Sequence, residues 1–313
     1  MKTLLISFIL SLVSHTICIA QKIYKATLLL DAKATLGEGS IWHPGEKKLY
    51  WIDIDEKTLH TYDPDSKEET HYPLGQKVGT VVPIDTGGVL VALKDGVYAF
   101  NMKANTFRLI TSPEKDLIEN RFNDGKCDPW GRFWVGTMGP RYEAALYRIT
   151  APSECTKMFD SITTSNGIVW SSDKTKMFYI DTPTGEVRQY NYDNNTGNIS
   201  NAQIVVKFPK GIGYPDGMTI DSEGMLWIAH WGGSCVGRWN PVTGNMIAKV
   251  DVPALNITSC AFGGKYLDTL YITTAKTEMN EEQLKQFPLS GGVFSVTVDV
   301  KGTPANYFNT KHK

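Results

Sequence analysis

The strongest constraint on the fold is a repeat of about 45 residues. An apolar strand rich in aromatic residues recurs six times along the 313-residue chain. The six segments are LYWIDI (49–54), VLVALK (89–94), RFWVGTM (132–138), MFYIDT (177–182), MLWIAHW (225–231) and TLYITTA (269–275). Equivalent positions, counted from Trp51 to Tyr271, are separated by 39, 44, 45, 48 and 44 residues. A steady period of this length indicates that each repeat is one supersecondary unit of a larger array.

Each repeat also contains further short strands. A turn precedes each of the six segments, a second strand with an aromatic residue follows it, and a further apolar strand often comes next. Four strands per repeat at this period are typical of a β-propeller blade. Six repeats therefore predict an all-β, six-bladed β-propeller. The competing fold, a pair of β-sandwiches, does not explain the steady period.

The two ends of the chain are expected to close the ring. A strand over Ala26–Leu30 precedes the first full repeat, and the last repeat lacks an outer strand. Pairing of these N- and C-terminal strands would complete the sixth blade and hide its exposed edge. We therefore predict a single six-bladed propeller domain over residues 21–313.

Residues 1–20 have the character of a secretory signal peptide. Lys2 supplies the positive charge, an apolar run extends from Leu4 to Val13, and the segment ends in the small residue Ala20. The apolar run is too short to span a bilayer. We expect cleavage near Ala20, export to the periplasm or the medium, and no stable membrane association.

The composition excludes a nucleic-acid partner and argues against a cysteine-bound metal. The net charge is −1, from 32 Lys+Arg and 33 Asp+Glu, so no basic field exists to hold phosphates. Four cysteines follow the signal segment: Cys127, Cys155, Cys235 and Cys260. None forms a CxxC pair, so a zinc site is not predicted. Export permits a disulfide, but we interpret these cysteines as small buried hydrophobic residues.

Polar residues recur at one position in the repeats. Glu38, Asn123, Asn166 and Asp216 lie 11 to 13 residues before the aromatic residue that marks each repeat, and Ser259 occupies the same place in the last repeat. These residues open the first strand of their repeats. Because the innermost strand of a blade lines the central channel, we expect their side chains to converge at one end of the axis.

Carboxylates that converge in a confined channel repel one another unless a cation lies between them. Oxygen ligands suit Ca²⁺ or Mg²⁺, and Mn²⁺ or Zn²⁺ are the alternatives. Each residue also has an ordinary structural interpretation. Asn-Gly and Asp-Gly pairs are common in turns, and Glu38 between two glycines fits an exposed loop. The register shared by four repeats favours the metal site.

The chain resembles the SMP-30/gluconolactonase/luciferin-regenerating enzyme family, the regucalcin-like proteins. The motifs that carry the resemblance are LGEGSIWHPGEKKLYWIDI, NRFNDGKCDPWGRFWVGTM, SNGIVWSSDKTKMFYIDTPTGEVRQYNYD, YPDGMTIDSEGMLWIAHWGG and TSCAFGGKYLDTLYITTA. The resemblance implies one divalent cation in the channel, calcium first, bound by Glu38, Asn166 and Asp216. It implies that Arg121 and Asn123 contact the substrate. Asp216 also matches the residue that acts as general acid/base.

The function implied by this resemblance is hydrolysis of sugar lactones, as in a gluconolactonase. The metal would polarise the lactone carbonyl, and Asp216 would transfer protons. Two alternatives remain open: a propeller phosphotriesterase or arylesterase, and a non-enzymatic calcium-binding propeller. We expect a small-molecule sugar lactone as the partner and a monomeric protein.

A few residues near these motifs are open to two interpretations. Pro140 and Arg141 stand where some animal family members carry acidic residues, so the identity of the lactone is not carried over. His230 either lines the channel mouth or is a packed, hydrogen-bonded residue. Asp124 and Asp128 are interpreted as residues that hold a turn and the blade edge.

Exported protein should begin near Gln21, because the segment before it has the sequence features of a cleaved signal peptide. Mass spectrometry of the protein purified from its native host measures this directly. An intact Met1 on the exported protein would contradict the signal-peptide prediction.

Overall fold

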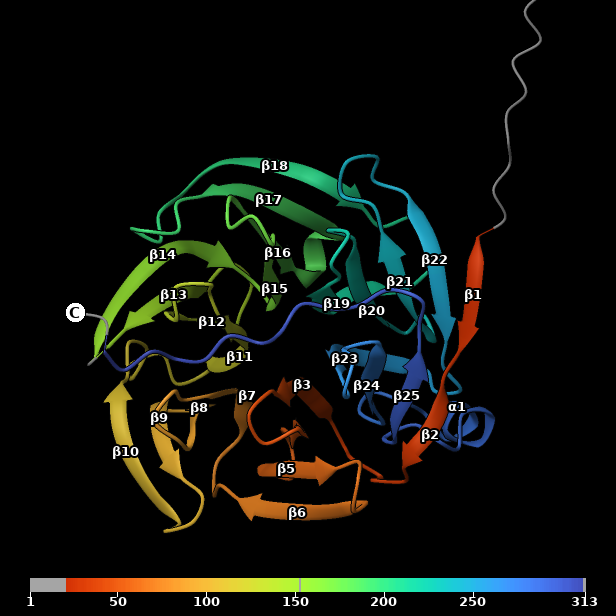
Figure 1. Ribbon diagram of the computed structural model, residues 1–313, viewed down its shortest axis with the longest axis horizontal. Coiled ribbons are helices and arrows are strands. Elements are labelled where there is room, and N and C mark those ends of the chain that lie inside the picture. Colours follow the sequence, from red (N-terminus) through yellow and green to blue (C-terminus); the bar gives the residue numbers. More distant parts are fainter. Residues whose placement is uncertain (1–20, 152, 312–313) are drawn as a thin grey trace, which may run out of the picture.

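Six β-sheets are arranged around a central axis, as Figure 1 shows. The computed structural model describes residues 21–151 and 153–311. Five sheets have four strands and one has five. The predicted six-bladed, all-β propeller is therefore confirmed. The predicted signal peptide, residues 1–20, lies outside the described residues.

Within a blade, the strands follow one another in chain order from the axis outward. Blades 1 to 3 consist of β3 (Gly37–His43), β4 (Lys48–Asp53), β5 (Thr58–Asp63) and β6 (Glu68–Pro73); β7 (Val78–Pro83), β8 (Val89–Leu93), β9 (Gly96–Asn101) and β10 (Thr106–Thr111); and β11 (Arg121–Cys127), β12 (Phe133–Met138), β13 (Ala144–Thr150) and β14 (Glu154–Ile162). Blades 4 to 6 consist of β15 (Ser165–Trp170), β16 (Lys176–Asp181), β17 (Glu186–Tyr192) and β18 (Ile199–Lys207); β19 (Tyr214–Ile220), β20 (Leu226–Trp231), β21 (Cys235–Trp239) and β22 (Met246–Asp251); and β23 (Asn256–Gly263), β24 (Thr269–Ala275) and β25 (Val293–Thr297).

The N-terminal strands close the ring. β2 (Thr27–Leu30) pairs antiparallel with β25 and is the outermost strand of blade 6, as predicted. β1 (Lys22–Lys25) adds a parallel fifth strand to blade 5 by pairing with β22, which the sequence did not predict. The first ten described residues therefore join blades 5 and 6, which lie at the right of Figure 1.

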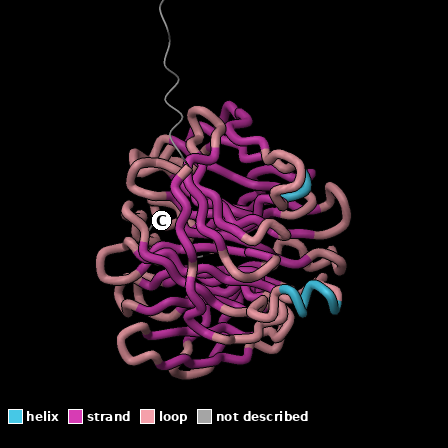
Figure 2. The backbone as a smooth tube through the Cα atoms, turned by 90° about the vertical axis from the view of Figure 1, so that its right-hand side faces the viewer, coloured by secondary structure: helices cyan, strands magenta, loops and turns pink. Residues whose placement is uncertain are grey.

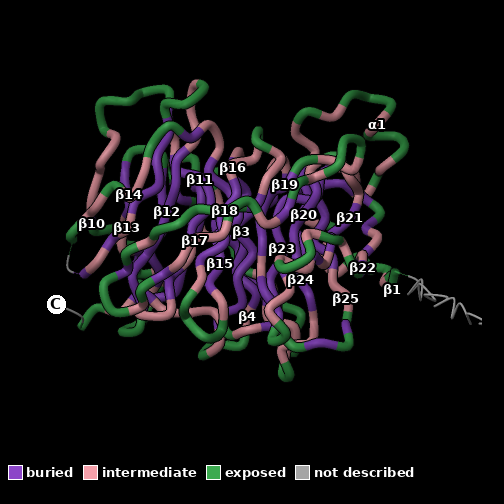
Figure 3. Tube along the Cα trace, turned by 90° about the horizontal axis from the view of Figure 1, so that it is seen from above, coloured by how far each residue is buried: buried purple, intermediate pink, exposed green. Residues whose placement is uncertain are grey.

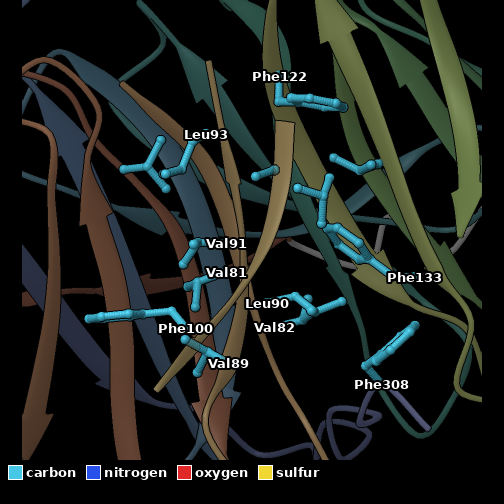
Figure 4. Packing of buried hydrophobic residues seen from close by; sticks show 14 of the residues in the cluster. Val81, Val82, Val89, Leu90, Val91, Leu93, Phe100, Phe122, Phe133 and Phe308 are labelled. Atoms are coloured by element: carbon cyan, nitrogen blue, oxygen red, sulfur yellow. The ribbon is translucent and has the colours of Figure 1, made fainter. Parts of the chain in front are cut away.

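The aromatic residues that mark the repeats form the cores between blades. Trp51, Trp134 and Trp227 are fully buried, and Leu90 at the equivalent position of blade 2 is also fully buried. Figure 4 shows the packing in one of these cores, where Val and Phe side chains of blades 2 and 3 meet Phe308 from the C-terminal segment. Burial of a large apolar residue at this position, aromatic in five of the six repeats, explains why the period is visible in the sequence. The four cysteines among the described residues carry free thiols.

A buried aspartate holds the first turn of blade 3. The Asp128 carboxylate accepts hydrogen bonds from the backbone of Trp130, from Nε1 of Trp134 at 2.9 Å and from Nε of Arg132 at 2.7 Å. Arg132 in turn donates to the Tyr192 hydroxyl of blade 4 at 2.8 Å. This ion pair therefore fixes a turn and joins two blades, which agrees with the role expected for Asp128.

The same arrangement recurs in blade 5. Asp221 accepts hydrogen bonds from Nε1 of Trp227 at 2.8 Å and from Nε of Arg238 at 2.7 Å. In both blades the aspartate lies six residues before the buried tryptophan. The repeat therefore preserves a polar anchor in addition to its apolar core.

The two faces of the ring differ. The C-terminal segment crosses one face in Figure 1, where Gly302 and Phe308 form isolated bridges with Asp221 and Ile84. A cavity of about 250 Å³ lies beneath this segment. The helices η1 (Thr182–Thr184) and α1 (Glu281–Gln286) both lie on the other side, as Figure 2 shows. In the part of the chain that is described, no helix is long and apolar enough to cross a membrane.

Replacing Asp128 by alanine should lower the free energy of unfolding by about 3–5 kcal/mol, because it leaves the buried Arg132 guanidinium without its partner. Urea denaturation followed by circular dichroism measures the change. Asp173, which caps an exposed turn, is a matched control, and Asp173→Ala should have a much smaller effect. Equal losses in the two variants would contradict the anchoring role of Asp128.

Candidate functional site

The innermost strand of every blade has an irregularity near its start. Strand pairing with the neighbouring strand shifts between Glu38 and Ile41, Val78 and Thr80, Phe122 and Gly125, Ser165 and Ile168, Pro215 and Met218, and Ile257 and Ser259. Such bulges bend a strand and redirect its side chains. The polar motifs of four blades coincide with these bulges. The polar residue and the glycine that follows it, as in Asn166-Gly167 and Asp216-Gly217, therefore lie inside strands. The turn interpretation of these motifs is therefore wrong.

Glycines after the polar residues allow neighbouring blades to approach closely. A Cβ atom on Gly167 would lie 2.8 Å from the Asp216 carbonyl oxygen of the next blade. A Cβ atom on Gly217 would lie 2.8 Å from the Thr258 carbonyl oxygen of the blade after that. A larger residue at either position would push two innermost strands apart. The absence of a side chain at Gly167 thus brings Asn166 and Asp216 together.

Three carboxylic acids are buried at this end of the channel. Glu38, Asp124 and Asp216 are each exposed by 8% or less. Burial raises the pKa of Glu38 to about 8, and the negative charge of Asp124 adds to the effect. Burial also raises the pKa of Asp216 well above its ordinary value, with further contributions from Glu38 and Asp124. The carboxyl groups therefore oppose one another's ionisation unless positive charge is supplied.

Two oxygen atoms at the centre of the site have no hydrogen-bond partner. They are Oδ1 of Asn166 and Oδ1 of Asp216, both buried. The nitrogen of the Asn166 amide does have a partner: Nδ2 donates to the Thr182 hydroxyl at 2.9 Å. That hydroxyl in turn donates to the Pro215 carbonyl at 2.8 Å, which fixes the orientation of the amide. Buried acceptors without a partner are costly, and a bound cation would satisfy them.

The donor set fits the predicted metal. Glu38 and Asp216 supply carboxylates and Asn166 supplies an amide oxygen, which are the ligands that hard divalent cations prefer. These three residues come from blades 1, 4 and 5, and the charges of the two carboxylates interact across the channel. Their role as metal ligands stays a prediction that this geometry supports.

Arg121 and Asn123 form a separate hydrogen-bonded pair. Arg121 Nη1 donates to Asn123 Oδ1 at 2.7 Å and to the Phe122 carbonyl at 2.9 Å, while Asn123 Nδ2 donates to the Ser165 carbonyl at 2.7 Å. Both ends of the Asn123 amide are therefore occupied, in contrast to Asn166. Burial lowers the pKa of Arg121, and the charges of Glu38, Asp55 and Asp216 oppose that shift. The pair thus presents a cation beside the carboxylates.

Asp124 is a site residue that the sequence does not reveal. Its motif predicts a turn residue, but the structure places Asp124 within β11, where its Oδ1 accepts a hydrogen bond from Gly125 N at 2.7 Å. In a regular strand, neighbouring residues such as Asn123 and Asp124 face opposite sides. The bulge in β11 allows both to contribute to the channel, and strand alternation alone gives no sign of this.

Ser259 contributes to blade packing and not to the polar cluster. Its hydroxyl accepts a hydrogen bond from Ser40 N at 2.9 Å and is 2.7 Å from the Thr273 hydroxyl. Blade 6 is thereby joined to blade 1. The polar residue of the sixth repeat therefore shares the register of the others but has a structural role.

His230 is a packed histidine. It is fully buried, its Nδ1 lies 2.9 Å from the Ile212 carbonyl oxygen, and its ring stacks on Trp239. Burial lowers its pKa to about 4. The ring is therefore neutral at physiological pH. Of the two interpretations of His230, the packed residue is the one the structure supports.

The channel mouth on the helix side carries exposed apolar groups and a cation. Ile118, Tyr142 and Tyr214 are each more than half exposed and lie at the starts of innermost strands or in loops beside them. Arg141 lies over the Tyr142 ring at 4.8 Å and donates to its hydroxyl. The loop with Pro140 and Arg141 therefore presents a guanidinium in place of an acidic group. Figure 3 shows the exposed loops around the buried strands.

The structure is a closed ring of six blades with buried carboxylate and amide oxygens at one end of its channel. The SMP-30/Gluconolactonase/LRE-like model matches residues 36–276. The chain therefore belongs to the SMP-30/gluconolactonase/LRE-like family.

Individual relatives agree with this assignment. The chain is 40% identical over 281 residues to the "Putative sugar lactone lactonase YvrE" of Bacillus subtilis, covering 88% of this chain and 96% of that protein. It is 35% identical over 293 residues to human regucalcin, covering 90% and 98%. The solved structure of a calcium-binding protein, regucalcin, from Agrobacterium tumefaciens superposes with a TM-score of 0.87 at 28% identity, covering 92% and 99%.

The metal-free protein should lose stability as the pH rises from about 5 to 8. The pKa of Glu38 is about 8 in the folded state against 4.5 as its ordinary value, so in this window the folded state binds more protons than the unfolded state. Saturating calcium should remove the loss, because a cation that binds only the native state stabilises it. Thermal melts at pH 5, 6, 7 and 8, with chelator or with calcium, measure both effects.

Asp216→Ala is the critical variant for this prediction. It should show no calcium-dependent rise in Tm, whereas Asp65→Ala, at an exposed turn, should behave like the unmodified protein. Elemental analysis after chelation and re-addition gives the metal content independently. One equivalent of tightly retained metal in Asp216→Ala would show that the ligand set is wrong.

Proposed function

We propose that the protein is a divalent-metal-dependent hydrolase that opens the ring of sugar lactones. One observation carries the proposal: two unpartnered, buried acceptors, on Asn166 and Asp216, lie in a channel that also holds the Arg121–Asn123 pair. This combines a cation site with a positioned donor for substrate oxygen. Membership of the family and the name of the Bacillus subtilis relative support the lactone as substrate class.

Glu38, Asn166 and Asp216 would hold the cation, with calcium as the first choice and magnesium, manganese or zinc as alternatives. When bound, it supplies a Lewis acid that polarises the lactone carbonyl and stabilises the negative charge of the transition state. Calcium is favoured because the regucalcin of Agrobacterium tumefaciens, which shares this fold, is described as a calcium-binding protein. The carboxylates of Glu38 and Asp216 would then be ionised at neutral pH.

Asp216 is the proposed general acid/base. Its carboxylate takes a proton from the attacking water, whose oxygen forms a bond to the carbonyl carbon. The bond between that carbon and the ring oxygen then breaks, and Asp216 returns the proton to the ring oxygen. The product is an open-chain hydroxy acid. Burial and the nearby acids Glu38 and Asp124 raise the pKa of Asp216 in the metal-free site. A bound cation would weaken the carboxylate as a base, so the proton transfer requires its partial detachment from the cation.

Arg121 orients the substrate. Its guanidinium has five N–H donors, and the contacts with Asn123 and the Phe122 carbonyl both use Nη1. The remaining donors can bind a lactone oxygen or the carboxylate of the product. Asn123 holds the Arg121 side chain through its Oδ1, and the second N–H of its amide can donate to the substrate. The exposed tyrosines at the mouth offer apolar surfaces for a sugar ring.

The test is a substrate screen on chelated protein with each divalent metal added back. Aldonolactones of five and six carbons, aryl esters and organophosphates are compared in a pH-stat. Metal-dependent hydrolysis of lactones supports the proposal. Hydrolysis of phosphotriesters or aryl esters alone, or metal binding without hydrolysis of any substrate, would overturn it in favour of the two alternative functions.

Arg121→Ala should keep its metal and its fold but lose kcat/KM on the best lactone. A lost charge-assisted hydrogen bond is worth about 1.5–3 kcal/mol, or roughly ten- to a hundredfold in rate. Arg121→Lys should restore only part of the activity, because an ammonium group lacks the planar fork. Arg108→Ala, on the exposed strand β10, is the matched control. Full activity in Arg121→Ala would remove Arg121 from the site.

A further inference from the structure

A second group of possible metal ligands lies in the outer half of blade 1. His60 is on β5, and Glu69 and His71 are on β6. Nδ1 of His60 is 2.8 Å from Nδ1 of His71 and 3.1 Å from Oε1 of Glu69. One ligand atom from each of the three residues lies within 4.8 Å of the other two. The group is distinct from the channel residues, which come from the innermost strands (Figure 1).

The sheet places all three side chains on one face. His60 and His71 are direct partners in the antiparallel ladder of β5 and β6. Glu69 lies two residues before His71, so it points to the same face. Trp51 is the partner of His60 on β4, and the two rings stack with centroids 3.8 Å apart. The His60 ring is therefore held in place before any ligand arrives.

Hydrogen bonding alone does not satisfy this arrangement. A neutral imidazole carries one ring hydrogen, and its other nitrogen is an acceptor. If Nδ1 of His60 carries the hydrogen, that single hydrogen must be shared between two acceptors, Nδ1 of His71 and Oε1 of Glu69. If Nδ1 of His71 carries it, Nδ1 of His60 and Oε1 of Glu69 face each other as two acceptors. A cation among the three atoms accepts a lone pair from each of them.

We propose that His60, Glu69 and His71 bind a transition-metal ion of borderline softness, with Zn²⁺, Cu²⁺ or Ni²⁺ as the candidates. Two imidazoles and one carboxylate are a donor set that such ions prefer, whereas the oxygen ligands of the channel suit a harder cation. The site therefore takes a different metal class from the one proposed for the channel.

The exposure of the three side chains suits metal entry from solvent. The His60 side chain is 11% exposed and Glu69 is 21% exposed, while His71 is 55% exposed. His60 and Glu69 thus form a fixed base, and His71 can move. Ligand atoms about 2.1 Å from a tetrahedral ion lie roughly 3.4 Å apart, so a small outward movement of His71 completes the geometry. A fourth position remains open to water.

Zinc titration of the chelated protein by calorimetry tests the proposal. His71→Ala and Glu69→Gln should each lose one zinc equivalent, or weaken the Kd of one site by at least about 10- to 100-fold. Glu68→Gln, which removes the same charge from the opposite face of β6, should bind zinc like the unmodified protein. Zinc binding by His71→Ala and Glu69→Gln that equals that of the unmodified protein would overturn the proposal. The comparison does not depend on whether the channel also binds zinc.

Tryptophan fluorescence gives a second readout that is local to the site. Cu²⁺ bound by His60 would lie next to Trp51 and quench its emission, so one equivalent of Cu²⁺ should quench the unmodified protein and not His71→Ala. In Trp51→Phe the same addition should quench less, while zinc stoichiometry is kept. Equal quenching in the unmodified protein and His71→Ala would contradict the site. The calcium-dependent Tm shift of His71→Ala should be unchanged, because the channel is intact.

Discussion

The close approach of the six innermost strands around the axis is the constraint on which the rest of the structure depends. Bulges occur in all six of these strands, and the glycines at 167 and 217 leave no room for a side chain between neighbouring blades. Because the strands meet so closely, polar residues from blades far apart in the sequence share one small volume. The same contact determines the diameter of the ring and the composition of the site.

That proximity has an electrostatic consequence. Glu38, Asp124 and Asp216 oppose one another's ionisation in a place where water cannot screen them. The scaffold tolerates this because stability comes from elsewhere: the buried aromatic residues between blades, and anchors such as the Asp128–Arg132 ion pair. A rigid, self-supporting ring can therefore hold a set of acidic groups whose mutual repulsion a bound cation would relieve.

The two proposed sites differ in ligand chemistry and in their distance from the axis. Oxygen donors from blades 1, 4 and 5 meet in the channel, whereas the imidazoles of His60 and His71 meet within the outer strands of one blade. The channel site needs the closed ring to exist at all. The outer group needs only the pairing of β5 and β6, so it belongs to a local hairpin and is independent of ring closure.

The sequence by itself determined the number of blades, the closing role of the N-terminal strand and the register of Glu38, Asn123, Asn166 and Asp216. The reason is that each repeat buries a large apolar residue, aromatic in five of the six, and that in these four repeats it follows the polar residue by 11 to 13 positions. Only the tertiary structure decided which polar residues belong to the site. The structure places Asp124 in the site and Ser259 outside it. The reason is that a bulge changes the direction of a side chain without changing the position of the residue in the repeat. The parallel β1 on blade 5 also came from three-dimensional contacts, since pairing between strands distant in sequence leaves no periodic signal. The His60–His71 pair depends on the register of the β5–β6 hairpin, which only the structure shows.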